Sequence, residues 1–363
     1  MRARNRMERV ADATALRLRL RASFRDRYNR PVTRPPRILI VKLSSFGDIL
    51  HALSLVDALR SGFPTATIDW VVRADLAHLV AGHPGLNTAH SLPRKGWREG
   101  IAMGRTLRGQ QYDIVFDIQG LFYSGWLAWL TRAPRRIGFD NNREGNRCFL
   151  TDSATVGTDR APMAAKILRT AERVGLPGKT VVAQTWLAEA GRDVVLGLLP
   201  EHFRRENAVG LVVGASTPVK TLSPQRWASL TAALRGAGCE PVLIGGKQEI
   251  PLAESIATGG PCIDLIGKTP LSVLPAVIEQ CSVVIGGDTG ATHLAAALGV
   301  PVIGLYGATD PARSGTDWGP GPSVILDGGG SEGTRNFRHA PDGIIDRISE
   351  EQILGAVSQL RSL

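Results

Sequence analysis

The sequence predicts an α/β protein with two doubly wound, Rossmann-like parallel domains facing a cleft. Three observations support this fold class. Short apolar runs bounded by glycine alternate with longer segments of helical spacing, as expected for strands covered by helices on both faces. Polar turns follow several of these strands, and open α/β sheets bind ligands at that edge. The length of 363 residues suits two domains.

Composition excludes several classes of protein. No apolar run reaches the roughly 18 residues that span a bilayer, and the four cysteines lack metal-type or disulfide-type spacing. The net charge of +10 is unevenly distributed, because residues 1–37 contain twelve Arg, no Lys and three acids and so carry +9. The remaining chain carries only +1, which argues against a nucleic-acid-binding body. We therefore expect no nucleic-acid partner and a reduced, cytoplasmic environment.

Residues 1–36 form a basic N-terminal arm. Within it, residues 9–27 have helical spacing, with Leu16, Leu20 and Phe24 on one narrow stripe. A basic amphipathic segment of this kind suits the anionic surface of a membrane. A solvated tail explains the same pattern equally well, so both interpretations stay open.

The first domain is expected at residues 37–190. It begins with an apolar strand over 37–42, a polar turn over 43–48 and a helix of regular apolar spacing. The turn is not a dinucleotide fingerprint, because G-x-G-x-x-G is absent. Instead it places Asp48 at a helix start, with His51 on the same helical face. Asp48 is then either a catalytic carboxylate or a first-turn acid that stabilises the helix dipole.

Further strand–helix units follow in the first domain. We expect strands over 67–72 and 113–117, a helix near 74–81, and another helix that opens at residues 119–124 and runs through Leu130. The connecting loops are expected to be basic and to suit an acidic substrate, or simply to be solvated. The residues assigned to these loops are Arg94, Lys95, Arg98, Arg132, Arg135, Arg136 and Arg143.

The second domain is expected at residues 191–348, followed by a C-terminal helix over 349–363. Its first strand, 208–213, leads into a turn of hydroxyls that ends in Lys220, a point charge suited to phosphate. Ser223 and Pro224 form a standard helix start. Further strands are expected over 241–245 and 263–265, with polar turns over 214–220, 245–249 and 286–293.

The most informative stretch is 282–307, which predicts a strand, a glycine-rich turn, a helix ended by Gly299 and a second strand. The turn carries Asp288, Thr289, Gly290 and His293, and free N–H groups at a helix start bind anions. Helix capping by Asp288 or Thr289 is an equally good explanation from the turn alone. The Asp-Thr-Gly triplet also resembles an aspartic-protease signature, but the chain has no second copy and the copy opens a helix.

With these turns described, the chain resembles glycosyltransferase family 9, the lipopolysaccharide heptosyltransferases, over about residues 37–360. The matching motifs are Val41–His51, Phe116–Leu121, Lys220 with its preceding hydroxyls, and Gly287–Leu294 leading to Tyr306–Pro311. Among subfamilies it looks most like heptosyltransferase I. The resemblance implies a GT-B fold, no cofactor, no metal, and inversion at the anomeric carbon. It implies an ADP-heptose donor and a Kdo-lipid A acceptor at the cytoplasmic face of the inner membrane, and hence peripheral contact with an anionic membrane.

The resemblance also implies roles for individual residues. Asp48 would be the catalytic base, with His51 and Lys220 as further catalytic residues. The donor would contact a set of residues in the second domain: Ser216, Lys220, Glu249, Asp288, Thr289, Gly290 and His293. The acceptor would contact residues of the first domain: Ser44, Ser45, Gly47, Gln119 and Arg143.

Two other functions remain compatible with the sequence. A nucleotide-sugar epimerase on the same fold would need no acceptor, which leaves the basic first-domain residues unexplained. A non-catalytic nucleotide-sugar-binding protein of envelope assembly would keep the 286–293 turn but would not need Asp48.

Overall fold

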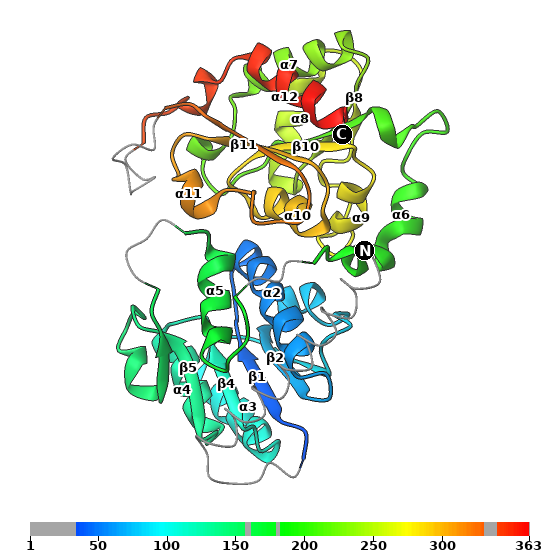
Figure 1. The fold of residues 1–363 in the computed structure, drawn as a ribbon. Coiled ribbons are helices and arrows are strands. Elements are labelled where there is room, and N and C mark those ends of the chain that lie inside the picture. Colours follow the sequence, from blue (N-terminus) through cyan, green and yellow to red (C-terminus); the bar gives the residue numbers. More distant parts are fainter. Residues whose placement is uncertain (1–33, 157–160, 179–181, 330–339, 363) are drawn as a thin grey trace, which may run out of the picture. The chain divides into compact units, whose positions relative to one another are not determined.

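The computed structural model describes residues 34–156, 161–178, 182–329 and 340–362 (Figure 1). These residues form two compact units. The first contains residues 34–45, 52–156 and 164–178, and the second contains residues 46–51, 161–163, 182–329 and 340–362. The start of the helix after the first strand and residues 182–190 therefore group with the second unit. The basic arm, including the amphipathic segment 9–27, lies outside the described residues.

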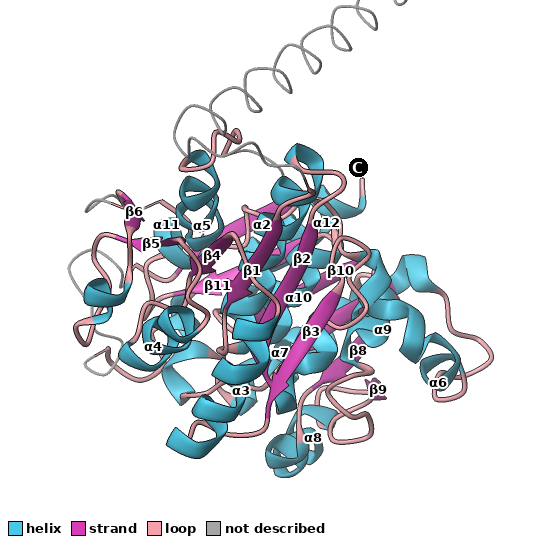
Figure 2. Cartoon of the chain, turned by 90° about the horizontal axis from the view of Figure 1, so that it is seen from below, coloured by secondary structure: helices cyan, strands magenta, loops and turns pink. Residues whose placement is uncertain are grey.

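The first unit is built on a six-stranded parallel sheet with the order β3-β2-β1-β4-β5-β6 (Figure 2). Its strands are β1 (Arg37–Val41), β2 (Thr67–Arg73), β3 (Thr88–Leu92), β4 (Ile114–Asp117), β5 (Arg135–Phe139) and β6 (Asp152–Ala154). Its helices are α2 (Phe46–Gly62), α3 (Trp97–Gly109), α4 (Phe122–Leu130) and α5 (Met163–Glu172), except that residues 46–51 of α2 and Met163 of α5 group with the second unit. Leu107 of α3 and Leu127 of α4 join the core formed by Leu39 and Val115, so these helices cover one sheet face.

Several first-domain predictions need correction. Arg135 and Arg136 do not lie in a loop but on strand β5, and Arg98 lies in the first turn of α3. The segment predicted as a helix near 74–81 is a 3-10 helix, η1 (Ala74–Leu79). Strands β3, β5 and β6 were not predicted, because their apolar residues are few and interrupted by polar ones.

The second unit contains another six-stranded parallel sheet, with the order β12-β11-β10-β7-β8-β9. Its strands are β7 (Ala208–Val212), β8 (Glu240–Ile244), β9 (Ile263–Asp264), β10 (Val283–Gly287), β11 (Val302–Tyr306) and β12 (Ser323–Asp327). Its helices are α6 (Arg192–Leu196), α7 (Pro224–Gly236), α8 (Ile250–Ala257), α9 (Leu274–Glu279), α10 (Gly290–Leu298), α11 (Pro311–Ser314) and α12 (Glu350–Arg361).

Local sequence signals explain the main elements of this unit. Helix α7 begins at Pro224 after the N-cap residue Ser223, as expected. Gly299 ends α10 in a left-handed conformation with φ of +79°, which glycine adopts without steric cost. Every residue of β7, β10 and β11 is buried, which accounts for their uninterrupted apolar runs.

The predicted fold class is confirmed in its central feature, because each unit is a doubly wound parallel sheet. The predicted C-terminal helix is also present as α12. Among the residues that the structure describes, no helix is long and apolar enough to cross a membrane.

Candidate active site

The order of strands brings two distant loops together in the second unit. The chain runs from β7 outward to β9 and then returns to place β10 on the other side of β7. Such a reversal leaves a crevice at the carboxyl ends of the two central strands, where doubly wound sheets bind their ligands. The loop after β7 contains Lys220, and the loop after β10 contains Asp288.

A chain of polar contacts connects these loops. The Lys220 Nζ lies 3.0 Å from Asp288 Oδ2, and Asp288 Oδ1 lies 3.1 Å from His293 Nε2. The indole N–H of Trp318 donates to His293 Nδ1 at 3.2 Å. Lys220 and Asp288 are 15% and 14% exposed in their side chains, so the ion pair is largely shielded from water. The side chains of Lys220, Asp288, His293 and Trp318 therefore hold one another in place at the reversal of strand order.

Trp318 fixes the orientation of the His293 ring. Its indole nitrogen can only donate a hydrogen bond, so Nδ1 of His293 acts as the acceptor. In a neutral imidazole the proton then resides on Nε2, from which it points at the Asp288 carboxylate. His293 thus donates to Asp288 from one side while the Lys220 ammonium approaches from the other.

Asp288 is strongly stabilised as an anion. Burial alone would raise the pKa of its carboxyl, but the hydrogen bond and charge of His293, together with Lys220, outweigh burial and hold that pKa well below its usual range. The carboxylate is consequently charged at any physiological pH. It is a permanent hydrogen-bond acceptor at the carboxyl edge of the sheet.

The start of α10 lies beside this group. Thr289 is the N-cap residue and accepts a hydrogen bond from the Thr292 N–H, while the two hydroxyls lie 3.0 Å apart. Capping, one of the two interpretations of the turn, is therefore correct for Thr289. It does not exclude anion binding, because the first N–H groups of a helix lack intrahelical partners and carry the positive end of the dipole. A side chain at Gly287 would collide with the Lys220 carbonyl, so glycine here allows Lys220 to lie close to the end of β10.

The beginning of α2 packs against α10 within the second unit. An added Cβ at Gly290 would lie 2.6 Å from the Phe46 ring, and one at Gly47 would lie 3.4 Å from His293. The ring of His51 lies 4.7 Å from that of His293 and 4.4 Å from that of Trp318. Asp48, in the same first helical turn, is partly buried. Asp48 and His51, the two catalytic candidates near the start of α2, thus belong to the segment that contacts the start of α10.

The remaining donor candidates lie on neighbouring loops. Glu249 ends the 3-10 helix η6 (Lys247–Glu249) after β8 and accepts from the Gly246 N–H at 2.7 Å. An added Cβ at Gly214 would come 2.9 Å from the Glu249 carboxyl carbon, so this side chain reaches the loop after β7. Ser216 is exposed on that loop. Its neighbour Thr217 has a hydroxyl that is buried and forms no hydrogen bond.

In the first unit, the acceptor candidates meet at the equivalent reversal between β1 and β4. The side chain of Gln119, after β4, accepts from the N–H groups of Leu43 and Ser44, after β1, both at 3.0 Å. These bonds hold the 43–45 turn, with Ser44 and Ser45, against the 119–121 turn. The sequence motifs around 41–51 and 116–121 are therefore adjacent in space.

A buried carboxyl group supports the second of these turns. Asp117 has no exposed surface and accepts from the N–H groups of Gln119 and Gly120, both at 3.2 Å, and from Asn146 Nδ2 at 2.6 Å. Burial raises the pKa of Asp117, and its hydrogen bonds, including that of Asn146, oppose this rise. Asn146 also donates to the Leu121 carbonyl at 2.7 Å. It therefore anchors both ends of the Gln119 turn.

We expect Asn146→Ala to destabilise the protein by about 2–4 kcal/mol, because it leaves a fully buried carboxyl group with one strong donor fewer. The measurement is urea unfolding followed by circular dichroism. The exposed Asn141 offers a matched control, and Asn141→Ala should change stability by less than about 0.5 kcal/mol. Equal stability of the two variants would contradict the anchoring role of Asn146.

The predicted basic loops form only in part. Arg135 is buried and donates to Asp152 at 2.8 Å and to the Arg173 carbonyl, and Arg136 donates to the carbonyls of Ala133 and Phe149. These two side chains are held inside the first unit, so the prediction that they meet an acidic substrate is wrong. Arg143 is exposed beside the Gln119 turn, and its N–H donates to the Gly120 carbonyl at 3.0 Å.

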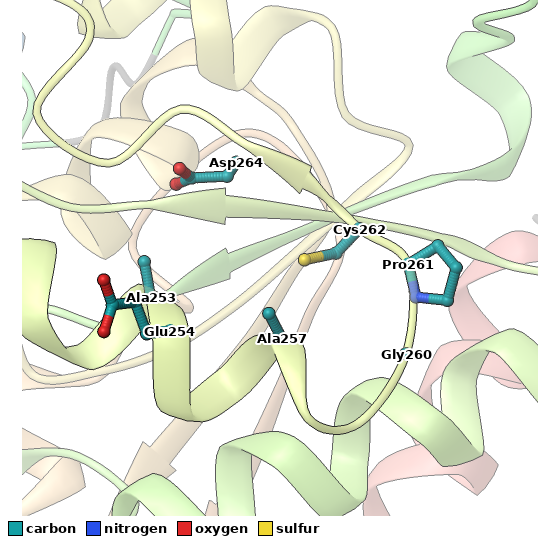
Figure 3. A pocket seen from close by; sticks show the side chains of 7 residues that line it. All are labelled: Ala253, Glu254, Ala257, Gly260, Pro261, Cys262 and Asp264. Atoms are coloured by element: carbon teal, nitrogen blue, oxygen red, sulfur yellow. The ribbon is translucent and has the colours of Figure 1, made fainter.

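A hollow of about 450 Å³ lies elsewhere on the second unit, along the connection from α8 to β9 (Figure 3). It is lined by Ala253, Glu254, Ala257, Gly260, Pro261, Cys262 and Asp264. This connection enters β9 at its amino end, whereas the site residues follow the carboxyl ends of strands. Burial raises the pKa of the Cys262 thiol, which makes it a poor nucleophile. The hollow is separate from the candidate active site.

Three residues at these sites were not predicted from the sequence. Trp318 follows His293 by 25 residues, in a segment without a motif, and only the fold brings the rings together. Asn146 begins a short 3-10 helix, Asn146–Phe149, in a polar segment without a motif, and Thr217 was covered only by the general expectation of hydroxyls in its turn. A buried role for Trp318 had one weak signal, since large aromatic residues in glycine-rich loops usually pack against something.

Two doubly wound parallel domains, with a cation and a helix start at the reversal point of the second sheet, define the GT-B class of glycosyltransferases. Solved structures agree with this fold. The glycosyltransferase family 9 protein of Veillonella parvula DSM 2008 matches with a TM-score of 0.77 and 21% identity, covering 90% of this chain and 97% of that one. The structure titled E. coli heptosyltransferase WaaC with ADP matches with a TM-score of 0.71 and 23% identity, covering 89% and 99%.

The sequence comparison resolves the family. The model of glycosyltransferase family 9 (heptosyltransferase) matches residues 101–326, and the chain belongs to this family. It is 28% identical over 302 residues to lipopolysaccharide heptosyltransferase 1 of Pseudomonas aeruginosa, with 77% of this chain and 81% of the relative covered. It is 25% identical over 293 residues to the lipopolysaccharide core heptosyltransferase OpsX of Haemophilus influenzae, with the same coverage. The protein is thus a glycosyltransferase, and the predictions of family and enzyme class are confirmed.

Proposed function

We propose that the protein transfers a heptose from an ADP-heptose donor to a Kdo-containing lipid A acceptor in lipopolysaccharide core synthesis, with inversion at the anomeric carbon and without a metal. The observation that carries this proposal is the Lys220–Asp288–His293 chain beside the start of α10. It combines a positive charge, a helix dipole and a fixed carboxylate at the reversal point of one sheet. A sugar diphosphate offers the groups that match all three.

The donor would bind with its diphosphate at Lys220 and the first N–H groups of α10, assisted by Thr289 and by hydroxyls of the 214–220 loop. Lys220 and the helix dipole would stabilise the negative charge that develops as the bond to phosphate breaks. The Asp288 carboxylate would accept hydrogen bonds from sugar hydroxyls. Glu249 would contact the nucleoside, since it lies on the neighbouring loop after β8.

The reaction requires an acceptor hydroxyl to attack the anomeric carbon while it loses its proton. Asp48 would take this proton, and the bond from the anomeric carbon to the diphosphate oxygen would break, releasing ADP. Attack from the face opposite the diphosphate inverts the configuration. The turns held together by Gln119, with Ser44, Ser45, Gly47 and Arg143, would bind the acceptor. The exposed guanidinium of Arg143 suits the carboxylate of a Kdo sugar.

The identity of the acceptor depends on the heptosyltransferase subtype. The relatives divide among heptosyltransferases 1 and 2 and OpsX at 25–28% identity, so overall identity does not separate the subtypes. We favour the first heptose transfer because the Ser-Ser-x-Gly-Asp motif over 44–48 and residues 68–72 and 143–144 resemble that subfamily. Such an acceptor is a lipid of the inner membrane, so the proposed location is peripheral, on its cytoplasmic face.

A thermal-shift panel of ADP-, UDP- and GDP-sugars tests the donor. A ligand at 100 times its Kd stabilises a protein by roughly 2.7 kcal/mol, and only ADP-sugars should give such a shift. A larger shift with UDP- or GDP-sugars would contradict the proposed nucleotide. Incubation with ADP-heptose and Kdo-lipid A, followed by NMR of the product, should give the inverted anomer.

The same assay separates the two other functions considered. An epimerase would change the donor sugar without an acceptor, and a binding protein would leave the donor intact. Membership of a glycosyltransferase family supports transfer over both alternatives. Consumption of ADP-heptose that depends on the acceptor would exclude them.

A further inference from the structure

The outer surfaces of α3 and α4 carry large apolar side chains that the fold of the first unit leaves uncovered. Trp97 is 69% exposed, Ile101 38%, Phe122 51% and Trp129 52%. We call these four residues, together with the partly exposed Trp126, the aromatic face. Single exposed apolar residues are common on protein surfaces, whereas contiguous groups of them mark interaction sites.

Helical spacing and ring contacts make the aromatic face continuous. On α4, Phe122, Trp126 and Trp129 are spaced i, i+4 and i+7, so they form one stripe. On α3, Trp97 and Ile101 are one turn apart. The rings of Trp97 and Trp126 lie 5.5 Å apart and join the two stripes.

Two glycines of α3 create this arrangement. Gly100 and Gly104 are buried against α4, where an added Cβ at Gly100 would collide with the Trp126 ring and one at Gly104 would lie 2.5 Å from Leu130. The helices therefore approach closely, with Leu107 and Leu127 packed toward the sheet. Trp97 and Trp129 are left to point away from the core.

Basic side chains surround the aromatic face. Six basic residues of this region are exposed: Arg94, Lys95, Arg98, Arg105, Arg108 and Arg132. Within residues 93–112 and 119–132 the one acid is Glu99, and its carboxylate pairs with Arg94 at 2.6 Å. On α3 the stripe of Trp97 and Ile101 continues into Arg105 and Arg108, so aromatic and cationic groups share one side of the helix.

We propose that the aromatic face and its basic border form a docking surface for an anionic lipid bilayer. Tryptophan prefers the boundary between headgroups and acyl chains, and exposed Arg and Lys are attracted by anionic headgroups. A soluble protein partner would need its own acidic rim to match a border in which basic residues outnumber acids by six to one, whereas an anionic bilayer supplies this charge together with an apolar interior. This surface lies in the described part of the chain and is distinct from the arm over residues 1–36.

The position of the aromatic face within the first unit fits this role. Phe122 is the first residue of α4 and directly follows the Gln119 turn, and α3 begins after the carboxyl end of β3. The carboxyl ends of parallel strands share one edge of a sheet, so the first turns of both helices lie at the edge that carries the 43–45 and 119–121 turns. A protein docked on lipid by this surface has those turns near the headgroups.

The test is binding of the full-length chain to sedimented vesicles of phosphatidylcholine with and without 30% phosphatidylglycerol. We expect binding only to the anionic vesicles, weakened by salt because exposed charges are screened. The double variant Trp97→Gln/Trp129→Gln should bind about tenfold more weakly, since it removes the two most exposed indoles. Leu196→Gln is the matched control, because Leu196 is 58% exposed on α6 of the second unit, and it should bind like the unmodified chain.

A second variant, Arg98→Glu/Arg105→Glu, should lose at least tenfold in affinity and most of the salt dependence. Several results would overturn the proposal. The first is that the unmodified chain does not bind vesicles. The second is that both double variants bind as well as the control, which would assign attachment to the arm. The third is that Trp97→Gln/Trp129→Gln changes the sedimentation coefficient of the protein but not its vesicle binding, which would assign the aromatic face to self-association. Vesicle binding requires no donor or acceptor, so its result is independent of the proposed reaction.

Discussion

Replacing Asp48 by asparagine is expected to lower kcat by 10²–10⁴-fold, the usual range for losing a positioned general base. A sugar hydroxyl is a poor nucleophile at neutral pH and must lose its proton as it attacks. Asp48 lies partly buried in the first turn of α2, between Gly47 and His51, which both contact α10. Asparagine keeps the shape and most of the hydrogen bonding of this side chain but cannot accept a proton. Affinity for the donor should stay within a few-fold of the unmodified value.

The alternative for Asp48 is a helix-start charge, which makes a different prediction. In that case Asp48→Asn should cost about 1 kcal/mol of stability or less and leave kcat nearly intact. Glu351→Gln provides the control, because Glu351 is an exposed acid in the first turn of α12 with no proposed catalytic role. Steady-state kinetics with isothermal titration of ADP distinguishes the outcomes. A folded Asp48→Asn protein that turns over at the normal rate would exclude the catalytic role.

The central parallel strands and the polar turns that follow them could be predicted, because both depend on the local sequence pattern. The run before Asp288 is apolar without interruption, and glycines bound it, so strand, turn and helix follow from spacing alone. The same holds for the strand before Lys42 and the turn to Asp48. In both units, a polar turn after a strand indicated the ligand-binding edge of the sheet, whereas the reversal of strand order at that point is known only from the structure. The donor and acceptor roles of the individual residues stay predictions.

Side-chain partners could not be predicted, because they depend on contacts between distant segments. The sequence gives no sign that Trp318 orients His293, or that Asn146 supports the turn of Gln119. Arg135 was misplaced for a related reason. Arg135 begins β5, next to the edge strand β6, and a charged residue at that position is typical of a loop. Only the structure shows that Asp152, 17 positions later, pairs with it. Burial of charge is decided by tertiary pairing and not by local pattern.

Substitutions in the Lys220–Asp288 pair distinguish a structural role of Lys220 from a role in binding the donor diphosphate. If the pair were only structural, Lys220→Ala would reduce stability but leave catalysis unchanged in the folded fraction. Asp288→Asn would then behave similarly, because each variant breaks the same 3.0 Å contact. If Lys220 instead contacts the leaving diphosphate, Lys220→Ala removes a charge from the reaction, whereas Asp288→Asn leaves that charge in place.

We therefore expect Lys220→Ala to lower kcat/KM by about 10²-fold, or about 2.7 kcal/mol, as for removal of one group that stabilises developing charge. ADP affinity should fall as well, because the diphosphate of the product occupies the same place. Lys268→Ala is the matched control, since Lys268 pairs with Asp264 at 2.9 Å in the same unit but is 52% exposed, and it should leave both quantities unchanged. Asp288→Asn should reduce ADP affinity less than Lys220→Ala does, because it keeps the ammonium. Unchanged kinetics together with unchanged ADP affinity in Lys220→Ala would assign this lysine to the structure of the loop after β7 and leave the helix start of α10 as the diphosphate-binding group.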